Sequence, residues 1–136
     1  ELGLLDEVAA AVRSILEAGF TPAVYTSRTE RVPGSASERL ALGQMISALI
    51  ARLVQGLPPE IGFLISKGGI TSHVLLAQGL LLSKVRVLGQ IAPGCSVVMP
   101  PAGHRFSGVP VVVFPGNVGD SDALRRVYGV LAGAGE

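Results

Sequence analysis

The stretch Ser66-Lys67-Gly68-Gly69-Ile70-Thr71-Ser72 decides how the rest of the chain is interpreted. It follows an apolar run, residues 61–65, that is typical of a buried strand, and it leads into a second apolar run typical of a short helix. Paired glycines let the backbone turn sharply and approach a ligand closely, because they lack a Cβ atom. The N–H groups of the first helical turn then face the ligand at the positive end of the helix dipole. We therefore predict a phosphate-binding loop, to which Lys67 adds a positive charge while Thr71 and Ser72 supply hydroxyl groups.

A second glycine-rich turn follows another predicted strand. Residues 109–114 form a β-branched run, typical of a strand in the middle of a sheet that is covered on both faces. The sequence Gly116-Asn117-Val118-Gly119 comes shortly after it. Ligands of open α/β sheets bind just beyond the carboxyl ends of the strands. The two loops together therefore favour an anion site more strongly than either loop does alone.

The remaining segments alternate between helical and strand patterns. We predict helices over residues 5–18, from residue 36 to Gly56, and after a cap at Asp120 or Ser121. Further strands are predicted at 21–26, 85–91 and 95–99, and the last two should pair antiparallel around the turn at 92–94. The predicted fold is α/β, a three-layer sandwich whose mostly parallel, partly mixed sheet has helices on both faces.

Ser35 and Glu38 have the spacing of a capping box, which predicts where the helix from residue 36 begins.

The composition is unusually apolar for a chain of 136 residues. Hydrophobic residues make up 49% and charged residues 15%, against about 25% charged residues in typical soluble domains. Some apolar surface should therefore face a second domain or another copy of the chain in a homo-oligomer. The net charge of +1, the 4% of aromatic residues and the absence of Trp argue against a nucleic-acid partner.

Nothing in the sequence indicates a membrane partner or an oxidising compartment. No uninterrupted apolar run reaches the roughly 18 residues of a membrane span, and the first residues lack the basic region of a signal peptide. The single cysteine, Cys95, cannot form an internal disulfide and is expected to be buried in its strand. We predict a cytoplasmic protein.

Several polar residues admit two interpretations each. His73 could bind phosphate or move a proton, but packing or capping of its helix is the favoured interpretation. His104, beside Arg105, could belong to a cover over a ligand, although a solvated loop pair is favoured. The two histidines and the cysteine lie too far apart in the chain to support a zinc site.

Charged residues near the predicted strand ends are equally ambiguous. Arg28 could reach an anion or be an ordinary loop charge. Asp120 and Asp122 could touch a metal bound to a nucleotide, but we favour an interaction with the helix dipole, so no protein metal site is predicted.

Three motifs together resemble the C-terminal nucleotide-binding domain of the four-carbon acid sugar kinases. They occur in the order and spacing of that family, and the resemblance spans about residues 20–132. The three motifs are Lys67-Gly68-Gly69-Ile70-Thr71-Ser72, Val87-Leu88-Gly89-Gln90-Ile91-Ala92-Pro93-Gly94 and Phe114-Pro115-Gly116-Asn117-Val118-Gly119-Asp120. The resemblance implies a transferase of carbohydrate metabolism that uses ATP and Mg²⁺. Its substrate would be a four-carbon sugar acid such as threonate, erythronate or an oxo-tetronate.

The resemblance also implies which residues bind ATP. It places nucleotide contacts at Gly68, Gly69, Ile70 and Thr71, and phosphate contacts at Gly116, Asn117 and Gly119; Lys67 and Ser72 complete the predicted set. It further implies that residues 1–136 are a single domain, the C-terminal part of a two-domain kinase whose sugar-binding N-terminal domain is absent here. The chain alone is then expected to be inactive and to bind ATP weakly, and no catalytic base can be identified in it.

Two other functions remain open from the residues alone. The same loops could hold a sugar phosphate or nucleotide in a non-catalytic binding module, or they could be tight turns of an interaction domain.

Overall fold

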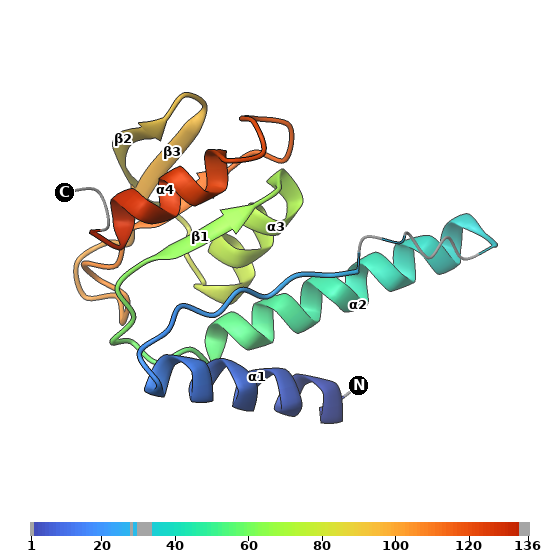
Figure 1. The fold of residues 1–136 in the computed structure, drawn as a ribbon. Helices are drawn as coiled ribbons and strands as arrows, with labels where there is room; N and C mark the ends of the chain where they lie inside the picture. Colours follow the sequence, from blue (N-terminus) through green and yellow to red (C-terminus); the bar gives the residue numbers. More distant parts are fainter. Residues whose placement is uncertain (1, 28, 30–33, 134–136) are drawn as a thin grey trace. The chain divides into compact units, whose positions relative to one another are not determined.

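The computed structural model describes residues 2–27, 29 and 34–133. The chain divides into two compact units, Glu1–Leu57 and Pro58–Glu136. The first unit contains helices α1 (Leu2–Glu17) and α2 (Ala36–Gln55), and the second contains a sheet with further helices (Figure 1). Arg28, weighed above as an anion contact, lies outside the described residues.

Helix α2 begins with the predicted capping box. The Glu38 N–H donates to Ser35 Oγ (3.2 Å), and the Ser35 N–H donates to Glu38 Oε2 (2.9 Å). The Ser35 hydroxyl also donates to Glu38 Oε2 (2.8 Å), and this bond, followed by the one from the Ser35 N–H, holds the pKa of Glu38 below its ordinary value. The prediction of this helix start is therefore confirmed.

The predicted strand at residues 21–26 does not form. A strand is stable only when its N–H and C=O groups pair with a neighbour, and these residues belong to no ladder within the described chain. Pro22 has no N–H to donate, and Val24 and Tyr25 are 56% and 86% exposed. The sequence predicted a strand here, but no described strand pairs with this segment.

The second unit has a four-stranded mixed sheet. Its strands are β1 (Leu64–Lys67), β2 (Arg86–Ala92), β3 (Cys95–Met99) and β4 (Val111–Phe114), in the spatial order β1-β4-β3-β2. Strands β1 and β4 are parallel, whereas β3 pairs antiparallel with both β4 and β2. The predicted hairpin around residues 92–94 is confirmed.

Strand β1 lies later in the chain than the predicted strand at 61–65. Its register with β4 pairs Leu64 with Val111 and Lys67 with Phe114, and the Leu64 N–H donates to Pro110 O (3.0 Å). The length of the paired partner therefore sets the limits of β1. As a result, Lys67 ends a strand instead of belonging to a loop.

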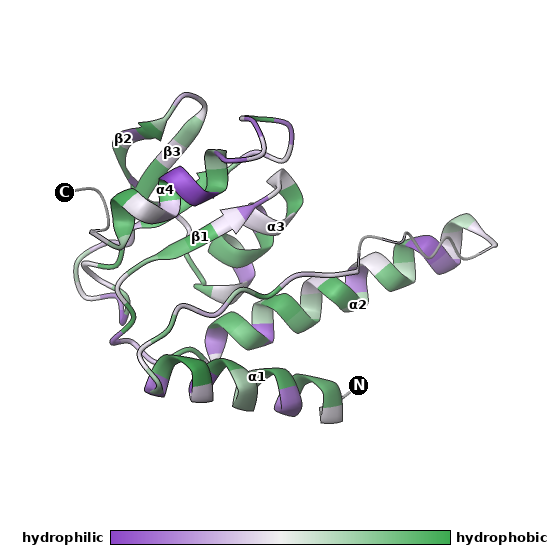
Figure 2. Ribbon diagram, viewed as in Figure 1, coloured by the Kyte–Doolittle hydropathy of each residue, from purple (hydrophilic) through white to green (hydrophobic). Residues whose placement is uncertain are grey.

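Helices cover both faces of this sheet. Helix α3 (Gly69–His73), which continues as the π-helix η1 (Val74–Gly79), lies on one face, and α4 (Ala123–Leu131) lies on the other (Figure 1). The α4 side holds a core cluster made by Cys95, Val112, Phe114, Ala123 and Val127. Figure 2 shows the strands as mostly hydrophobic and the first part of α4 as strongly hydrophilic. The predicted three-layer α/β sandwich and the burial of Cys95 are confirmed.

Helix α4 begins later than predicted. Its N-cap is Asp122 and not Asp120 or Ser121, and the Asp122 side chain makes no capping hydrogen bond. The Asp120 carboxylate instead accepts the Asp122 N–H (3.0 Å), so it stabilises the turn before the helix.

Among the described residues, no helix combines the length and hydrophobicity that crossing a membrane requires.

Candidate functional site

The two glycine loops meet at one edge of the sheet. Strands β1 and β4 are parallel neighbours, so their carboxyl ends lie side by side. The Gly68 N–H donates to Phe114 O (2.8 Å), and a Cβ atom on Gly116 would lie 3.9 Å from Gly68 Cα. The structure therefore brings together two segments that are almost fifty residues apart in the sequence.

The glycines of these loops fall into two groups. Gly68 (φ 109°) and Gly119 (φ 82°) have conformations that side chains rarely adopt, and a Cβ atom on Gly119 would overlap the Cβ of Ala123. A Cβ atom on Gly69 would meet nothing within 4 Å, and one on Gly116 would make only an ordinary contact. The fold thus requires Gly68 and Gly119, whereas Gly69 and Gly116 leave open space that a ligand could occupy.

Backbone N–H groups are available in both loops. Gly69, Ile70 and Thr71 form the first turn of α3, where N–H groups have no acceptor within the helix. In the second loop, the Val118 N–H donates to Pro115 O (3.4 Å), which closes a turn without using the N–H groups of its two central residues. Consecutive N–H groups of this kind form anion-binding concavities.

The two hydroxyl groups of the first loop have different surroundings. Ser72 is 4% exposed, and its Oγ lies 3.3 Å from Ser66 O and 3.1 Å from Ser66 Oγ. Thr71 is half-buried beside Gly68 and makes no hydrogen bond through its hydroxyl to another described residue. Thr71 can therefore donate to a ligand, while the Ser72 hydroxyl fastens α3 to the end of β1. Sequence reasoning missed Ser66, because its role depends on this contact across the turn.

Lys67 places its positive charge between the loops. Its Nζ lies 4.3 Å from the centroid of the Phe114 ring and donates to Pro115 O (3.4 Å). An ammonium group over an aromatic ring is attracted to the electron-rich face of that ring. The charge is thus held at the junction of the two loops.

The third motif also reaches this region. A Cβ atom on Gly94, at the tip of the β2–β3 hairpin, would lie 3.2 and 3.3 Å from the two Cγ atoms of Val118. The hairpin tip therefore packs against the second glycine loop, so the three predicted motifs are neighbours in space.

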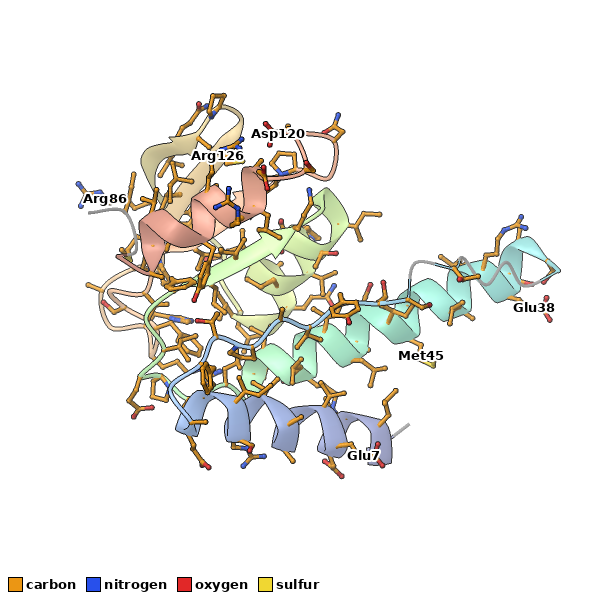
Figure 3. The ribbon with its side chains drawn as sticks, viewed as in Figure 1. Glu7, Glu38, Met45, Arg86, Asp120 and Arg126 are labelled. Carbon is orange, nitrogen blue, oxygen red and sulfur yellow. The ribbon has the colours of Figure 1, made fainter. Side chains whose placement is uncertain are left out.

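The aspartates after the second loop already have partners. Asp120 Oδ1 accepts a hydrogen bond from Arg126 Nη2 (2.9 Å), and Figure 3 shows both side chains near the start of α4. Arg126, with help from the Asp122 N–H, lowers the pKa of Asp120. Asp122 pairs with Arg125 (3.5 Å). The described residues include no group of three or more His, Cys, Asp or Glu side chains that could hold a metal ion.

His104 has a structural role that differs from the predicted solvated loop pair. Its Nδ1 accepts the Phe106 N–H (3.1 Å), so its Nε2 carries the hydrogen that is donated to Leu80 O (2.7 Å). The ring therefore ties the loop before β4 to the end of η1. This role depends on contacts across the fold, and no sequence pattern indicates it.

Comparisons with known proteins identify the family of the domain and its fold. Residues 3–124 match the family model described as "Nucleotide-binding C-terminal domain". A crystal structure with a similar fold is that of Haemophilus influenzae protein HI1011, from the family DUF1537, with a TM-score of 0.68 and 22% sequence identity. The alignment covers 93% of this chain and 31% of that protein. A search of curated proteins gives no match. The family model confirms the class of domain that the three motifs predict.

Proposed function

This chain belongs to the family of nucleotide-binding C-terminal domains, and from that premise we propose that its two glycine loops hold the phosphates of ATP for a sugar-acid kinase. The proposed reaction transfers the γ-phosphate to a hydroxyl of a four-carbon sugar acid of the threonate, erythronate or oxo-tetronate type. The proposed ATP contacts are Lys67, Gly68, Gly69, Ile70, Thr71, Gly116, Asn117 and Gly119. Ser72, predicted above as a contact, is left out because its N–H donates to Gly68 O (2.9 Å) and its hydroxyl is bonded to Ser66.

One observation carries the proposal: two loops with unpaired N–H groups meet beside a lysine. The contact between Gly68 and Gly116 brings both sets of N–H groups to one place, and the Lys67 ammonium group lies at the same junction. A triphosphate needs a site of this kind, because its charge is spread over several oxygen atoms.

The chemistry of phosphoryl transfer suits a site built from backbone N–H groups and a lysine. Such reactions depend mainly on positioning the phosphates and neutralising their charge. The N–H groups of the two loops would orient the phosphate oxygens, Lys67 would offset negative charge, and Thr71 would donate one further hydrogen bond. Gly69 and Gly116 would let the backbone come close enough for these bonds to form.

Magnesium would arrive with ATP. Mg²⁺ in nucleotide sites is held by phosphate oxygens together with one or two carboxylates, so a dedicated cluster of protein ligands is not needed. Asp120 is the carboxylate that follows the second loop, and binding the ion would require it to exchange Arg126 for the metal. When bound, the ion would neutralise charge on the transferred phosphate.

A second domain would supply the sugar acid and the catalytic base. The chain spans only about a third of the Haemophilus influenzae protein that shares its fold. In this chain, the two carboxylates after the second loop are both paired with arginines. We propose that such a two-domain enzyme works in the cytoplasm and that this chain alone does not turn over substrate.

The test replaces Gly69 and Gly116, the two loop glycines beside which the structure has room for a side chain. Gly69→Val and Gly116→Ala should leave the unfolding midpoint nearly unchanged and weaken ATP binding about tenfold or more, measured by NMR titration of the chain. In the two-domain protein, Gly69→Val should abolish turnover. Gly43→Ala is the control, since a Cβ there also meets nothing within 4 Å and Gly43 lies in α2. Unchanged ATP affinity in both loop variants would contradict the proposal.

A non-catalytic nucleotide or sugar-phosphate module is the second candidate, and the arginine-paired aspartates favour it. Measuring ADP release with and without threonate separates the two functions. Threonate-dependent ADP release by the two-domain protein supports the kinase, whereas ATP binding without release over a panel of four-carbon acids supports the module.

A further inference from the structure

We propose that a groove lined by α3, η1 and the segment after them receives the nucleobase of the bound nucleotide. This inference rests on the proposed function, because it takes the phosphates to lie at the two glycine loops.

The groove has the size and lining that a base needs. Its volume is about 250 Å³, and its lining combines four apolar side chains with three polar ones: Leu76, Ala77, Leu82 and Val85, then His73, Ser83 and Lys84. Pockets that enclose a whole drug-sized ligand measure about 300–1,000 Å³. The groove is therefore suited to one part of a nucleotide, a flat base that rests on aliphatic side chains.

Helix α3 connects the groove with the first glycine loop. Gly69 and His73 are four residues apart, so they lie on the same side of the helix, and His73 is the first residue of the groove. Ala77, another lining residue further along the helix, lies about 12 Å from Gly69 along an α-helical axis, and somewhat less where the helix widens to η1. The phosphates and ribose of a nucleotide form a flexible chain that can bridge a separation of this kind.

The polar rim is available for a ligand. His73, Ser83 and Lys84 make no hydrogen bond or ion pair through their side chains with any other described residue. Ser83 and Lys84 could donate to acceptor atoms of a base or ribose, and His73 lies between the groove and the phosphate loop. Polar groups of this kind orient a ligand whose main contacts are apolar.

Another groove is a weaker candidate. It measures about 220 Å³ and lies in the first unit, lined by α1 and residues 22–25. Its own unit contains neither glycine loop, so nothing connects it with the proposed phosphate site.

The experiment compares two ligands that share phosphates but differ in having a base. ATP and inorganic tripolyphosphate are titrated into the 136-residue chain, followed by NMR, for the unaltered protein and for Ala77→Leu and Ser83→Leu. Each variant adds aliphatic volume to the groove from a different segment. Ala132→Leu is the matched control, since Ala132 follows α4 on the opposite face of the sheet and is exposed.

We expect ATP to bind the unaltered chain more tightly than tripolyphosphate does. Both groove variants should weaken ATP binding about fivefold or more and change tripolyphosphate binding less than about twofold. Equal effects on the two ligands, or no effect on ATP in either variant, would overturn the groove assignment while leaving the phosphate site in place. If the unaltered chain bound neither ligand, the phosphate site itself would be contradicted, and the base groove with it.

Discussion

Gly119 stands where the second loop turns into α4, and its backbone has a φ of 82°. A side chain there would be strained by the conformation and would overlap Ala123, the first residue of α4, which is buried in the core. We predict that Gly119→Ala lowers the free energy of unfolding by about 2–4 kcal/mol, measured by urea denaturation.

The matched control is Gly129→Ala, within α4. A Cβ atom there meets nothing within 4 Å and the backbone is helical, so the change should raise the free energy of unfolding by about 0.5–1 kcal/mol. Equal losses in both variants would mean that the strain at Gly119 is not the cause.

Ser72 and Thr71 provide a second contrast at the residue scale. Removing the buried Ser72 hydroxyl leaves Ser66 without its partner, so Ser72→Ala should cost about 1–3 kcal/mol of stability. Thr71→Val keeps the shape of the side chain and breaks no hydrogen bond to a described residue, so it should cost less than about 1 kcal/mol and mainly weaken ATP binding. Urea denaturation measures the stability of both variants, and NMR titration measures their ATP binding. If Thr71→Val lost more stability and Ser72→Ala lost more ATP affinity, the roles proposed for the two hydroxyl groups would be wrong.

The individual side-chain roles were only partly predictable. Paired glycines after an apolar run indicated the first loop, because the need for close backbone approach is local. Which glycine the fold requires, and which hydroxyl faces inward, depends on the contacts of Gly119 with Ala123 and of Ser72 with Ser66. Those contacts are set by three-dimensional packing, so the sequence cannot show them.

The turn that leads into α4 should make stability depend on pH. Arg126 and the Asp122 N–H lower the pKa of Asp120 in the folded protein below the value of about 3.9 in an unfolded chain. The carboxylate therefore stabilises the fold above about pH 4, and this contribution is lost as the pH falls through the lowered pKa.

We accordingly predict that Asp120→Asn slightly lowers the thermal unfolding midpoint at pH 7 and that the difference shrinks below about pH 4. The effect should be small because both partners are more than half exposed. It should also shrink at high salt, since salt screens exposed charges. Calorimetry at several pH values measures it, and a difference that stayed constant down to pH 2 would exclude the ionic explanation.

Elements with local signals were predicted best. Helix α2 carries its own start signal in Ser35 and Glu38, so its beginning was correct. Strands depend on partners elsewhere in the chain: β1 follows the register of β4, and residues 21–26 have an extended pattern without a ladder. The paired strands around residues 92–94 succeeded because a hairpin is the one pairing that is local in sequence.

At the scale of the whole molecule, buried residues are distributed unequally between the two units. In the described part of the first unit, only Val12, Ala51 and Val54 are buried, whereas β4 alone contributes Val111, Val112 and Phe114. Amide protection follows such differences in burial, because weakly packed regions open before the whole fold does. The interpretation of residues 1–136 as a single domain stays a prediction.

We therefore predict that native-state hydrogen exchange will be slowest in β4 and faster in α1. The opening free energy of α1 should be lower by about 1.4 kcal/mol or more, which corresponds to tenfold faster exchange under the same conditions. Equal protection in both elements would mean that the two units open as one.

Because Cys95 is buried, a cysteine introduced into the first glycine loop could be labelled selectively. Cys95 is the only cysteine in the sequence and is 1% exposed, so it should react slowly with thiol reagents, while Ile70 in the loop is 80% exposed. A cysteine introduced by Ile70→Cys would then be the main site of labelling in the native protein. An environment-sensitive fluorophore attached there would turn the loop into an optical reporter of its own occupancy.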